Sequence, residues 1–393
     1  MKSASALSFE LDDPRETARE LGESIRQKLT LQNNSFGVLF CDADTDGAAL
    51  TAALKETLGI ETAGMTTLAA IDGGGREDAA ALLTVFTGDD CVFSPAVSGP
   101  LDASNYEKII AEAYMRTVSP DGAAPEVLFA FCPQGMGFSG DIYPEVISET
   151  APGVPVIGGV ASDDYDYKRA RVFLSGKEYK NSLVLAGLGG KLRPVFALRH
   201  VTSRFAERIR RVVDAEKNVV RRVGDETFVK YLEGFGLKTD VEDPLLAFTS
   251  YPMMLTREGK DETPLMRHIS SLNLEDGSGT FFGNVPAGTL ANICLVNKED
   301  VMAACRESMR ALLDQGKNQE GYEYSTVLCI SCCGRAMILG SESDAEGRIL
   351  SEMLPPGMTL FGAYGLGEIC PVHYNEGDAS NRFHNCSITF CMF

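Results

Sequence analysis

The sequence predicts an α/β (α+β) fold, with mixed β-sheets layered with helices and two consecutive domains. Short apolar runs typical of buried strands alternate along the chain with segments of helical periodicity. The 393 residues are too many for one ordinary hydrophobic core. Hydrophobic residues make up 44% and charged residues 23% of the chain, which is the balance of a packed globular protein.

The N-terminal part begins with a predicted amphipathic helix over Asp13–Leu29. Apolar residues recur there at spacings of three and four, after an Asp-Pro start signal: Ala18, Leu21, Ile25 and Leu29. We therefore treat residues 1–34 as an N-terminal helix segment. A strand, a helix and a strand follow it at Phe36–Phe40, Ala48–Leu58 and Ile60–Leu68.

The alternation continues to about residue 240. We expect a pair of strands in the region Val85–Phe93, and single strands at Glu126–Cys132, Val154–Ile157, Phe196–Arg199 and Val219–Val223. We expect helices at Tyr106–Thr117, Ile142–Thr150 and Glu226–Glu233. Two further apolar segments, Ala170–Leu174 and Ser182–Leu188, are predicted to form a hairpin because turn residues separate them.

A domain boundary is predicted at Lys238–Pro244, which has no apolar periodicity. Strands are expected beyond it at Leu246–Tyr251, His268–Asn273, Thr289–Val296, Ser325–Cys332, Thr359–Tyr364 and Ser387–Phe390. Helices are expected at Lys298–Gln315 and Glu346–Leu354. No repeat of fixed short period is visible.

Charge and cysteine content narrow the classes of function. The 36 lysines and arginines against 55 aspartates and glutamates give a net charge of −19, so nucleic acid and membrane surfaces are not expected partners. The 11 scattered cysteines, several of them in apolar runs, are typical of reduced, buried thiols in a cytoplasmic protein. No segment approaches the ~20 apolar residues of a membrane span, so we expect neither secretion nor insertion.

The segment Asp42–Gly47 follows a predicted strand and carries carboxylates at its first, third and fifth positions. A calcium loop also needs a glutamate at position twelve, where Ala53 stands. A phosphotransferase-like aspartate pair needs a hydroxyl residue two positions after Asp44, where Asp46 stands. We therefore expect a turn in which Asp46 or Thr45 caps the following helix.

A CxxCC motif ends an apolar strand at Cys329, Cys332 and Cys333. No second pair with matching spacing follows it, so a metal site is not expected. A nucleophilic thiol at Cys333 with His384 as its base is an alternative, although no third residue that would orient them is visible. The chain has four histidines, from which any haem ligand must come: His200, His268, His373 and His384.

Several motifs, taken in order, resemble the FIST family of sensory domains. The first is the turn Pro155–Asp164, which is similar to that family's glycine-glycine-alanine-x-aspartate turn. The others resemble the FIST C-terminal domain: Cys332–Arg335, Gly365–Ile369 and Phe383–Asn385. We identify residues 35–240 as a FIST N-terminal domain and residues 241–393 as a FIST C-terminal domain.

The resemblance implies a cytoplasmic signal-transduction sensor that binds an amino acid or a similar small polar molecule. It implies action through a partner protein such as a kinase, with neither a cofactor nor catalysis. Some members of the family suggest the alternative of a haem-based nitric oxide sensor, and a thiol-dependent hydrolase is the third hypothesis. The motifs give these candidate ligand-binding residues: Gly158, Gly159, Asp163, Arg335, Glu368, His384 and Asn385.

Two interpretations of Arg335 and Glu368 stay open. An arginine and a carboxylate at adjacent strand ends can hold the two charged ends of an amino acid. Alternatively, the two side chains pair with each other and pin two loops. Under the first interpretation, we expect one pocket between the loops that carry the candidate residues, with Arg335 as the anchor for an anionic or zwitterionic ligand.

Overall fold

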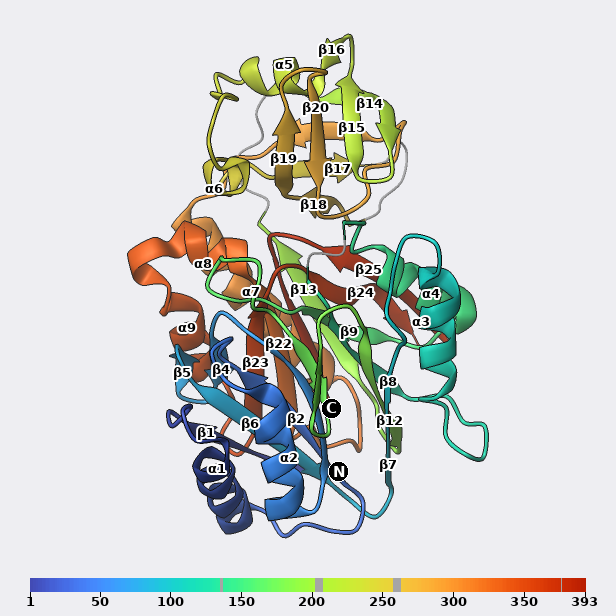
Figure 1. Cartoon of the computed structure of the whole chain (residues 1–393), viewed down its shortest axis with the longest axis vertical. Helices are drawn as coiled ribbons and strands as arrows, with labels where there is room; N and C mark the ends of the chain where they lie inside the picture. Colours follow the sequence, from blue (N-terminus) through green and yellow to red (C-terminus); the bar gives the residue numbers. More distant parts are fainter. Residues whose placement is uncertain (135–136, 202–207, 257–262, 376) are drawn as a thin grey trace.

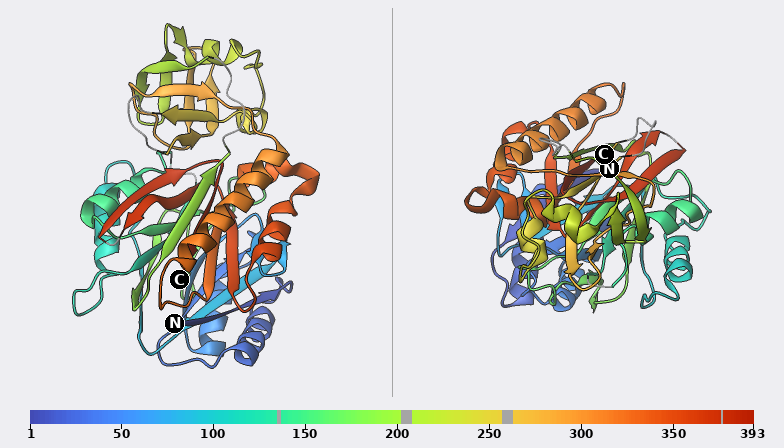
Figure 2. Two further views of the ribbon diagram at one scale, coloured as in Figure 1. Left: turned by 180° about the vertical axis from the view of Figure 1, so that it is seen from behind. Right: turned by 90° about the horizontal axis from the view of Figure 1, so that it is seen from above.

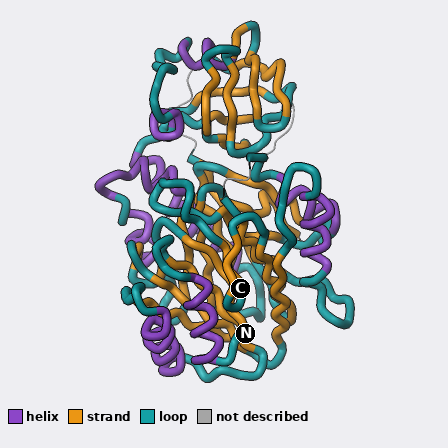
Figure 3. Tube along the Cα trace, viewed as in Figure 1, coloured by secondary structure: helices purple, strands orange, loops and turns teal. Residues whose placement is uncertain are grey.

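The computed structural model describes residues 1–134, 137–201, 208–256, 263–375 and 377–393. It has the predicted α/β fold, with mixed β-sheets layered with helices. A large body holds both ends of the chain, and a smaller unit rich in strands lies above it in Figure 1. Figure 3 shows that helices cover the outside of the body while strands fill its middle.

The body consists of three six-stranded sheets with the same internal order. Each has two parallel strands, an antiparallel strand and an edge strand on one side of them, and a two-stranded hairpin on the other side. The orders are β1-β6-β2-β3-β10-β11, β7-β12-β8-β9-β24-β25 and β13-β26-β22-β23-β4-β5. The body is therefore built from three structural repeats.

The bounds of the elements follow the three repeats. The first contains β1 (Lys2–Ser8), α1 (Pro14–Lys28), β2 (Ser35–Cys41), α2 (Gly47–Leu58), β3 (Glu61–Thr66), β4 (Ala70–Asp72), β5 (Gly75–Glu77) and β6 (Ala81–Thr87). The second contains β7 (Cys91–Val97), α3 (Tyr106–Met115), β8 (Val127–Cys132), α4 (Ile142–Thr150), β9 (Val156–Val160), β10 (Val172–Leu174), β11 (Lys177–Tyr179) and β12 (Val184–Gly190). The third contains β13 (Val195–His200), α7 (Lys298–Lys317), β22 (Thr326–Cys332), α8 (Cys333–Leu339), η1 (Gly340–Glu342), α9 (Ala345–Met353), β23 (Thr359–Gly365), β24 (Glu368–Asn375), β25 (Asp378–His384) and β26 (Ser387–Met392).

Each repeat gives its hairpin to the sheet of another repeat. The hairpin β4–β5 extends the third sheet, β10–β11 extends the first, and β24–β25 extends the second. No sheet of the body is complete without residues from a second repeat, so the three repeats form one folding unit.

A glycine at the same place in the third strand of each repeat supports their equivalence. A Cβ atom on Gly64 would lie 1.8 Å from the carbonyl oxygen of Leu39, and one on Gly158 would lie 1.9 Å from that of Ala130. In the third repeat, a Cβ on Gly362 would lie 2.3 Å from the oxygen of Cys329. Only glycine lets the two parallel strands approach so closely.

The upper domain (residues 208–296) is inserted in the third repeat between β13 and α7 (Figure 2). Its eight-stranded antiparallel sheet has the order β18-β17-β21-β14-β15-β20-β19, with β16 beside β15. The sheet closes over its own core of aliphatic and aromatic side chains. Its elements are β14 (Arg210–Glu216), β15 (Val219–Val223), β16 (Glu226–Thr227), α5 (Phe228–Glu233), α6 (Pro244–Phe248), β17 (Met253–Thr256), β18 (Leu265–Arg267), β19 (Ile269–Asn273), β20 (Ser278–Phe281) and β21 (Leu290–Ile293).

Two predicted elements were wrong. The segment Leu246–Tyr251 is not a strand, because Asp243 caps a helix over Pro244–Phe248 and a proline at the first helical position favours that start. The predicted hairpin of Ala170–Leu174 with Ser182–Leu188 does not form. Strand β10 pairs with β11 and β3, while β12 pairs with β7 and β8.

The N-terminal segment is part of the first sheet and not a separate helix. Strand β1, which the sequence analysis missed, pairs with β6, and α1 packs against α2. The predicted boundary at Lys238–Pro244 lies between α5 and α6, inside the upper domain. The change of composition there marks a loop of the inserted domain.

Two local predictions, the cap of α2 by Asp46 and the burial of the free thiols, were confirmed. Asp46 caps α2 by accepting a hydrogen bond from Ala49 N at 2.8 Å. All 11 cysteines are free and buried. No cluster of histidine, cysteine and carboxylate side chains in the described ranges could hold a metal ion. Among the helices in the described part of the chain, none is both long enough and apolar enough to cross a membrane.

Candidate ligand-binding site

The third strands of the three repeats end together in the middle of the body. The Ser162 hydroxyl donates to Tyr364 O at 2.6 Å, and the Thr67 hydroxyl donates to the same oxygen at 2.9 Å. Val160 N donates to Gly367 O at 3.0 Å. The loops after β3, β9 and β23 are thereby joined at the carboxyl ends of parallel strands, where sheet proteins commonly place binding sites.

A cavity of about 420 Å³ opens beside these strand ends, beneath the upper domain. Its volume lies within the range of small-molecule sites, about 300 to 1,000 Å³. The body contributes Pro133, Gln134, Phe138, Gly140, Tyr143, Val160, Tyr167, Leu366 and Phe383. The upper domain contributes Asp243, Leu245, Ser270 and Phe282. The cavity therefore lies between two separately folded parts and is walled mainly by aromatic and aliphatic groups.

A buried ion pair joins the upper domain to the body at this cavity. Arg267 Nη2 donates to the two carboxylate oxygens of Asp141 at 3.0 and 3.1 Å, and the side chains are 1% and 6% exposed. Arg267 Nη1 also donates to Phe383 O at 3.0 Å. Gly140 N donates to Phe282 O at 2.9 Å. These bonds fix wall residues from both parts.

The cavity has few polar groups, and they include one carboxylate and one amide donor. Among the described residues that line it, Asp243 is the one charged side chain. Its carboxylate caps α6 by accepting from Leu246 N at 3.1 Å, and it remains exposed at the rim. The Gln134 amide nitrogen is buried without a hydrogen-bond partner among the described residues. The cavity thus offers an anionic acceptor and an unused donor, which suits an ammonium group and a carboxylate respectively.

A small inner space of about 20 Å³ adjoins the cavity and is lined by His268, Cys332, Cys333 and Gly334. It has room for one water molecule. Burial lowers the pKa of His268 to about 4, so the ring is neutral near pH 7. Burial raises the pKa of Cys333 to about 12, which keeps the thiol protonated. These two groups do not form an activated thiol and base.

Residues 35–226 match the FIST N domain, and residues 226–371 match the FIST C domain. The chain belongs to the FIST family. FIST domains are associated with sensory signal transduction, which supports a sensor role for this chain. None of the curated proteins compared with it is similar in sequence.

Solved structures resemble this FIST chain only weakly. A cyanuric acid hydrolase from A. caulinodans shares 8% identity over 99% of this chain and 98% of its own, with a TM-score of 0.41. Another cyanuric acid hydrolase structure shares 9% identity over 75% of this chain and 100% of its own, with a TM-score of 0.29. PurLQS from Thermotoga maritima shares 11% identity over 99% of this chain and 72% of its own, with a TM-score of 0.21.

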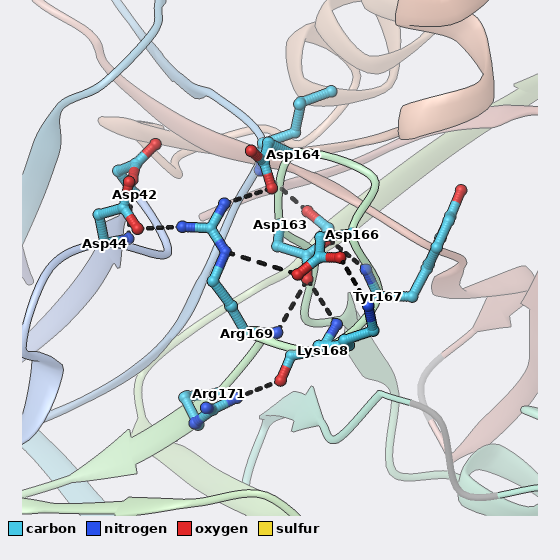
Figure 4. Close-up of polar contacts among 11 residues, drawn as sticks. Asp42, Asp44, Asp163, Asp164, Asp166, Tyr167, Lys168, Arg169 and Arg171 are labelled. Carbon is cyan, nitrogen blue, oxygen red and sulfur yellow. Dashed lines mark hydrogen bonds and ion pairs between the residues drawn. The ribbon is translucent and has the colours of Figure 1, made fainter.

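The glycine-glycine-alanine-x-aspartate turn of the FIST N domain stabilises a loop beside the cavity. Gly158 and Gly159 lie inside β9 and are buried. The carboxylate of Asp163 accepts backbone hydrogen bonds from Tyr167, Lys168 and Arg169, each at 3.0 Å (Figure 4). The motif thereby shapes the loop that brings the Tyr167 ring into the cavity wall.

The same loop is fastened to the first repeat. Arg169 forms ion pairs with Asp44 and Asp164, and its Nε lies 3.9 Å from Asp166 (Figure 4). The carboxylates of Asp42–Gly47 thus contribute one partner for an arginine from the second repeat. This is a structural use for the acidic turn that the sequence analysis considered as a calcium loop.

Arg335 lies behind the cavity and pairs with a residue that the sequence analysis did not consider. Its Nε and Nη2 donate to Glu346 Oε1 at 3.0 and 2.6 Å, and Nη2 also donates to Val301 O at 3.0 Å. Both side chains are fully buried. The expected pairing of Arg335 with Glu368 was therefore wrong. Arg335 is not among the residues that line the cavity, and its Nη1 has no partner among the described residues.

Glu368 is also fully buried, and its carboxylate accepts from the hydroxyl of Ser387 at 2.6 Å. Burial raises its pKa to about 8, against the lowering effect of its hydrogen bonds with Ser387 and Cys332. Its other oxygen, Oε1, has no partner among the described residues. Glu368 therefore belongs to the polar interior between β24 and β26 and does not line the cavity.

His384 and Asn385 lie in the same interior. His384 Nδ1 is 3.2 Å from His200 Nε2, and its Nε2 is 3.0 Å from Cys370 O. Burial lowers the pKa of His384 to about 3. Asn385 Oδ1 accepts from His268 N at 3.5 Å. His384 is therefore bonded on both nitrogens and is not placed as a base for Cys333.

Three of the four histidines, His200, His268 and His384, are buried. His200 and His384 contact each other, and His373 Nε2 is 2.7 Å from the amide nitrogen of Asn375. His268 has an Nε2 without a partner among the described residues, but it faces the space of about 20 Å³. A porphyrin cannot enter a space that holds one water molecule.

The sequence analysis missed most of the cavity wall. The aromatic residues Phe138, Tyr143 and Phe282 lie in no motif, and Phe383 begins the motif Phe383–Asn385 but was not among the candidate residues. Asp243 did have a signal, since an aspartate before a proline is a helix start, and such starts frequently carry polar groups at the surface.

Proposed function

We propose that this chain is a cytoplasmic signal-transduction sensor whose cavity beneath the upper domain binds a small amino acid or amine with an apolar or aromatic side chain. The observation that carries the proposal is the composition of the cavity wall. The wall holds five aromatic rings, one carboxylate at the rim, that of Asp243, and one unused amide donor, that of Gln134.

This ligand class follows from the chemistry of the wall. A carboxylate at the rim attracts an ammonium group, and aromatic faces stabilise a cation near them. The buried amide nitrogen of Gln134 can donate to a ligand carboxylate, which offsets the cost of leaving that nitrogen unpaired. The anchor differs from the one expected from sequence, because Arg335 pairs with Glu346 and does not line the cavity.

The position of the cavity supports a sensing role. A bound ligand would contact Phe282 and Ser270 of the upper domain together with Tyr143 and Phe383 of the body. A ligand that binds one arrangement of the two parts more tightly shifts the population toward it. We propose that a partner protein such as a kinase reads this arrangement, because the chain belongs to a family associated with signal transduction.

The test is calorimetric titration of the full chain with phenylalanine, leucine, phenethylamine and 3-phenylpropionate. We expect the compounds with an ammonium group to bind and 3-phenylpropionate, which lacks it, to bind weakest. Asp243→Asn keeps the helix cap, because asparagine caps as well as aspartate. Loss of a charged hydrogen bond worth about 1.5–3 kcal/mol should weaken binding by roughly 10- to 100-fold.

Glu242→Gln is the matched control, because Glu242 is the exposed neighbour of Asp243 and does not line the cavity. It should leave the affinity unchanged. Equal affinity of wild type and Asp243→Asn for phenethylamine, or binding of 3-phenylpropionate alone, would refute the proposal.

A further inference from the structure

A second cavity, of about 380 Å³, lies between the upper domain and the hairpin β24–β25. The upper domain lines it with Leu255, Thr256, Thr263, Leu265, Pro286 and Thr289. The hairpin lines it with Val372, His373, Ser380 and Arg382. None of these residues lines the cavity proposed for the amine, so the two spaces are separate sites.

Strand β25 divides the two cavities. Successive side chains of a strand point to opposite faces of the sheet. Phe383 lines the first cavity, and its neighbour Arg382 lines the second. Ser380, two positions before Arg382, is on the same face as Arg382, so the hairpin presents a guanidinium and a hydroxyl side by side.

A β-bulge adds His373 to this group. The register of β24 and β25 passes from the pair Pro371 and Asn381 to the pair Tyr374 and Ala379, so two residues on β24 face one on β25. Bulges redirect side chains and are frequent near functional sites. Here both bulged residues, Val372 and His373, line the cavity.

The charge of this cavity is opposite to that of the protein. No aspartate or glutamate is among the described residues that line it, although the chain has a net charge of −19. Arg382 is exposed, and its Nη1 donates to the preceding carbonyl, Asn381 O, at 3.3 Å. Within the described ranges its guanidinium forms no ion pair, and burial raises the pKa of the Glu145 carboxyl group while Arg382 acts from a distance to lower it. Such a guanidinium has donors left for a further acceptor.

We propose that this second cavity binds the oxyanion of a small molecule, a phosphate or a carboxylate. The planar fork of Arg382 matches two oxygens of either group, and Ser380, Thr256 and Thr263 supply hydroxyls around it. The hydroxyl of Thr289 donates to Pro286 O at 2.8 Å and is used within the loop. The ligand would contact the upper domain and the hairpin at once, at the junction that also closes the amine cavity.

The test is isothermal titration of the full chain with inorganic phosphate and with succinate, at an ionic strength near 0.15 M. Arg382→Gln removes the guanidinium at an exposed position, and we expect at least a tenfold loss of affinity. Arg199→Gln is the matched control, because Arg199 is also exposed and its Nη1 donates to its own preceding carbonyl at 3.0 Å, outside this cavity. We expect the control to bind like wild type.

The outcomes decide the proposal and the kind of anion. Binding of phosphate alone identifies a phosphorylated ligand, and binding of succinate alone identifies a carboxylated one. His373→Gln should weaken the binding of phosphate or succinate by a smaller factor than Arg382→Gln does. Absence of heat with both anions at millimolar concentration overturns the site, and so does equal loss of affinity in Arg382→Gln and Arg199→Gln. Circular dichroism of each variant verifies that the fold is retained.

Discussion

The substitution Glu346→Gln tests the buried ion pair between Arg335 and Glu346. Arg335 is the residue that the sequence predicted as a ligand anchor. Glutamine keeps the shape of Glu346 and can still accept from Arg335, but it removes the negative charge. Both side chains are fully buried, so the guanidinium is left without a counter-charge in the interior. Breaking a buried ion pair from one side costs about 3–5 kcal/mol, so we expect the free energy of unfolding of the body to fall by that amount.

The assay is urea unfolding followed by far-ultraviolet circular dichroism, with the midpoint and slope compared between proteins. Asp344→Asn is the matched control on the same helix, because Asp344 pairs with Arg348 at 3.1 Å with side chains 63% and 56% exposed. It should change stability by less than about 0.5 kcal/mol. The double substitution Arg335→Met with Glu346→Leu should recover part of the loss, since it removes the unpaired guanidinium but leaves the hydroxyls of Ser331 and Tyr364 without their acceptor.

A loss of unfolding free energy below about 1 kcal/mol for Glu346→Gln, or a loss no larger than that of Asp344→Asn, would refute this prediction. Either result would mean that water or a local rearrangement compensates Arg335.

Two further predictions concern the polar interior and the C-terminus. Glu368 has a pKa of about 8 in the fold against 4.5 in the unfolded chain, so its stabilising contribution is complete below pH 4.5 and is lost as pH rises through 8. As the pH is raised from about 5 to 8, the unfolding free energy of Glu368→Gln should therefore fall by less than that of wild type. Parallel curves of unfolding free energy against pH for the two proteins would contradict this. Deleting residues 387–393 should abolish soluble expression, because β26 pairs with β13 and β22 in the middle of a sheet. A monodisperse truncated protein with an unchanged melting profile would show otherwise.

The candidate residues from the FIST motifs fall into two groups, one in the loop that forms the cavity wall and one buried behind that wall. Asp163 lies in the loop that forms the cavity wall, and it fixes the backbone before Tyr167. Arg335, Glu368 and His384 are fully buried behind the wall and are bonded to protein groups. The motifs include two residues that line the cavity, Leu366 and Phe383. They could not separate lining residues from supporting ones, since both lie at the ends of the same strands.

The sequence by itself determined the elements with strong local signals. Apolar periodicity and caps predicted α2, α4, β8 and β22, and the family motifs predicted the two FIST domains. These features depend on residues close together in the chain, so a local pattern suffices for them.

Only the tertiary structure decided the three repeats, the exchanged hairpins and the partners of charged groups. Short polar strands such as β5 and β11 have no apolar alternation and become strands only because another repeat offers them a sheet edge. Arg267 and Asp141 are 126 positions apart, and either would pass for a surface charge until the fold buries both. Pairing at such distances depends on burial and sheet register, which the order of residues along one segment does not encode.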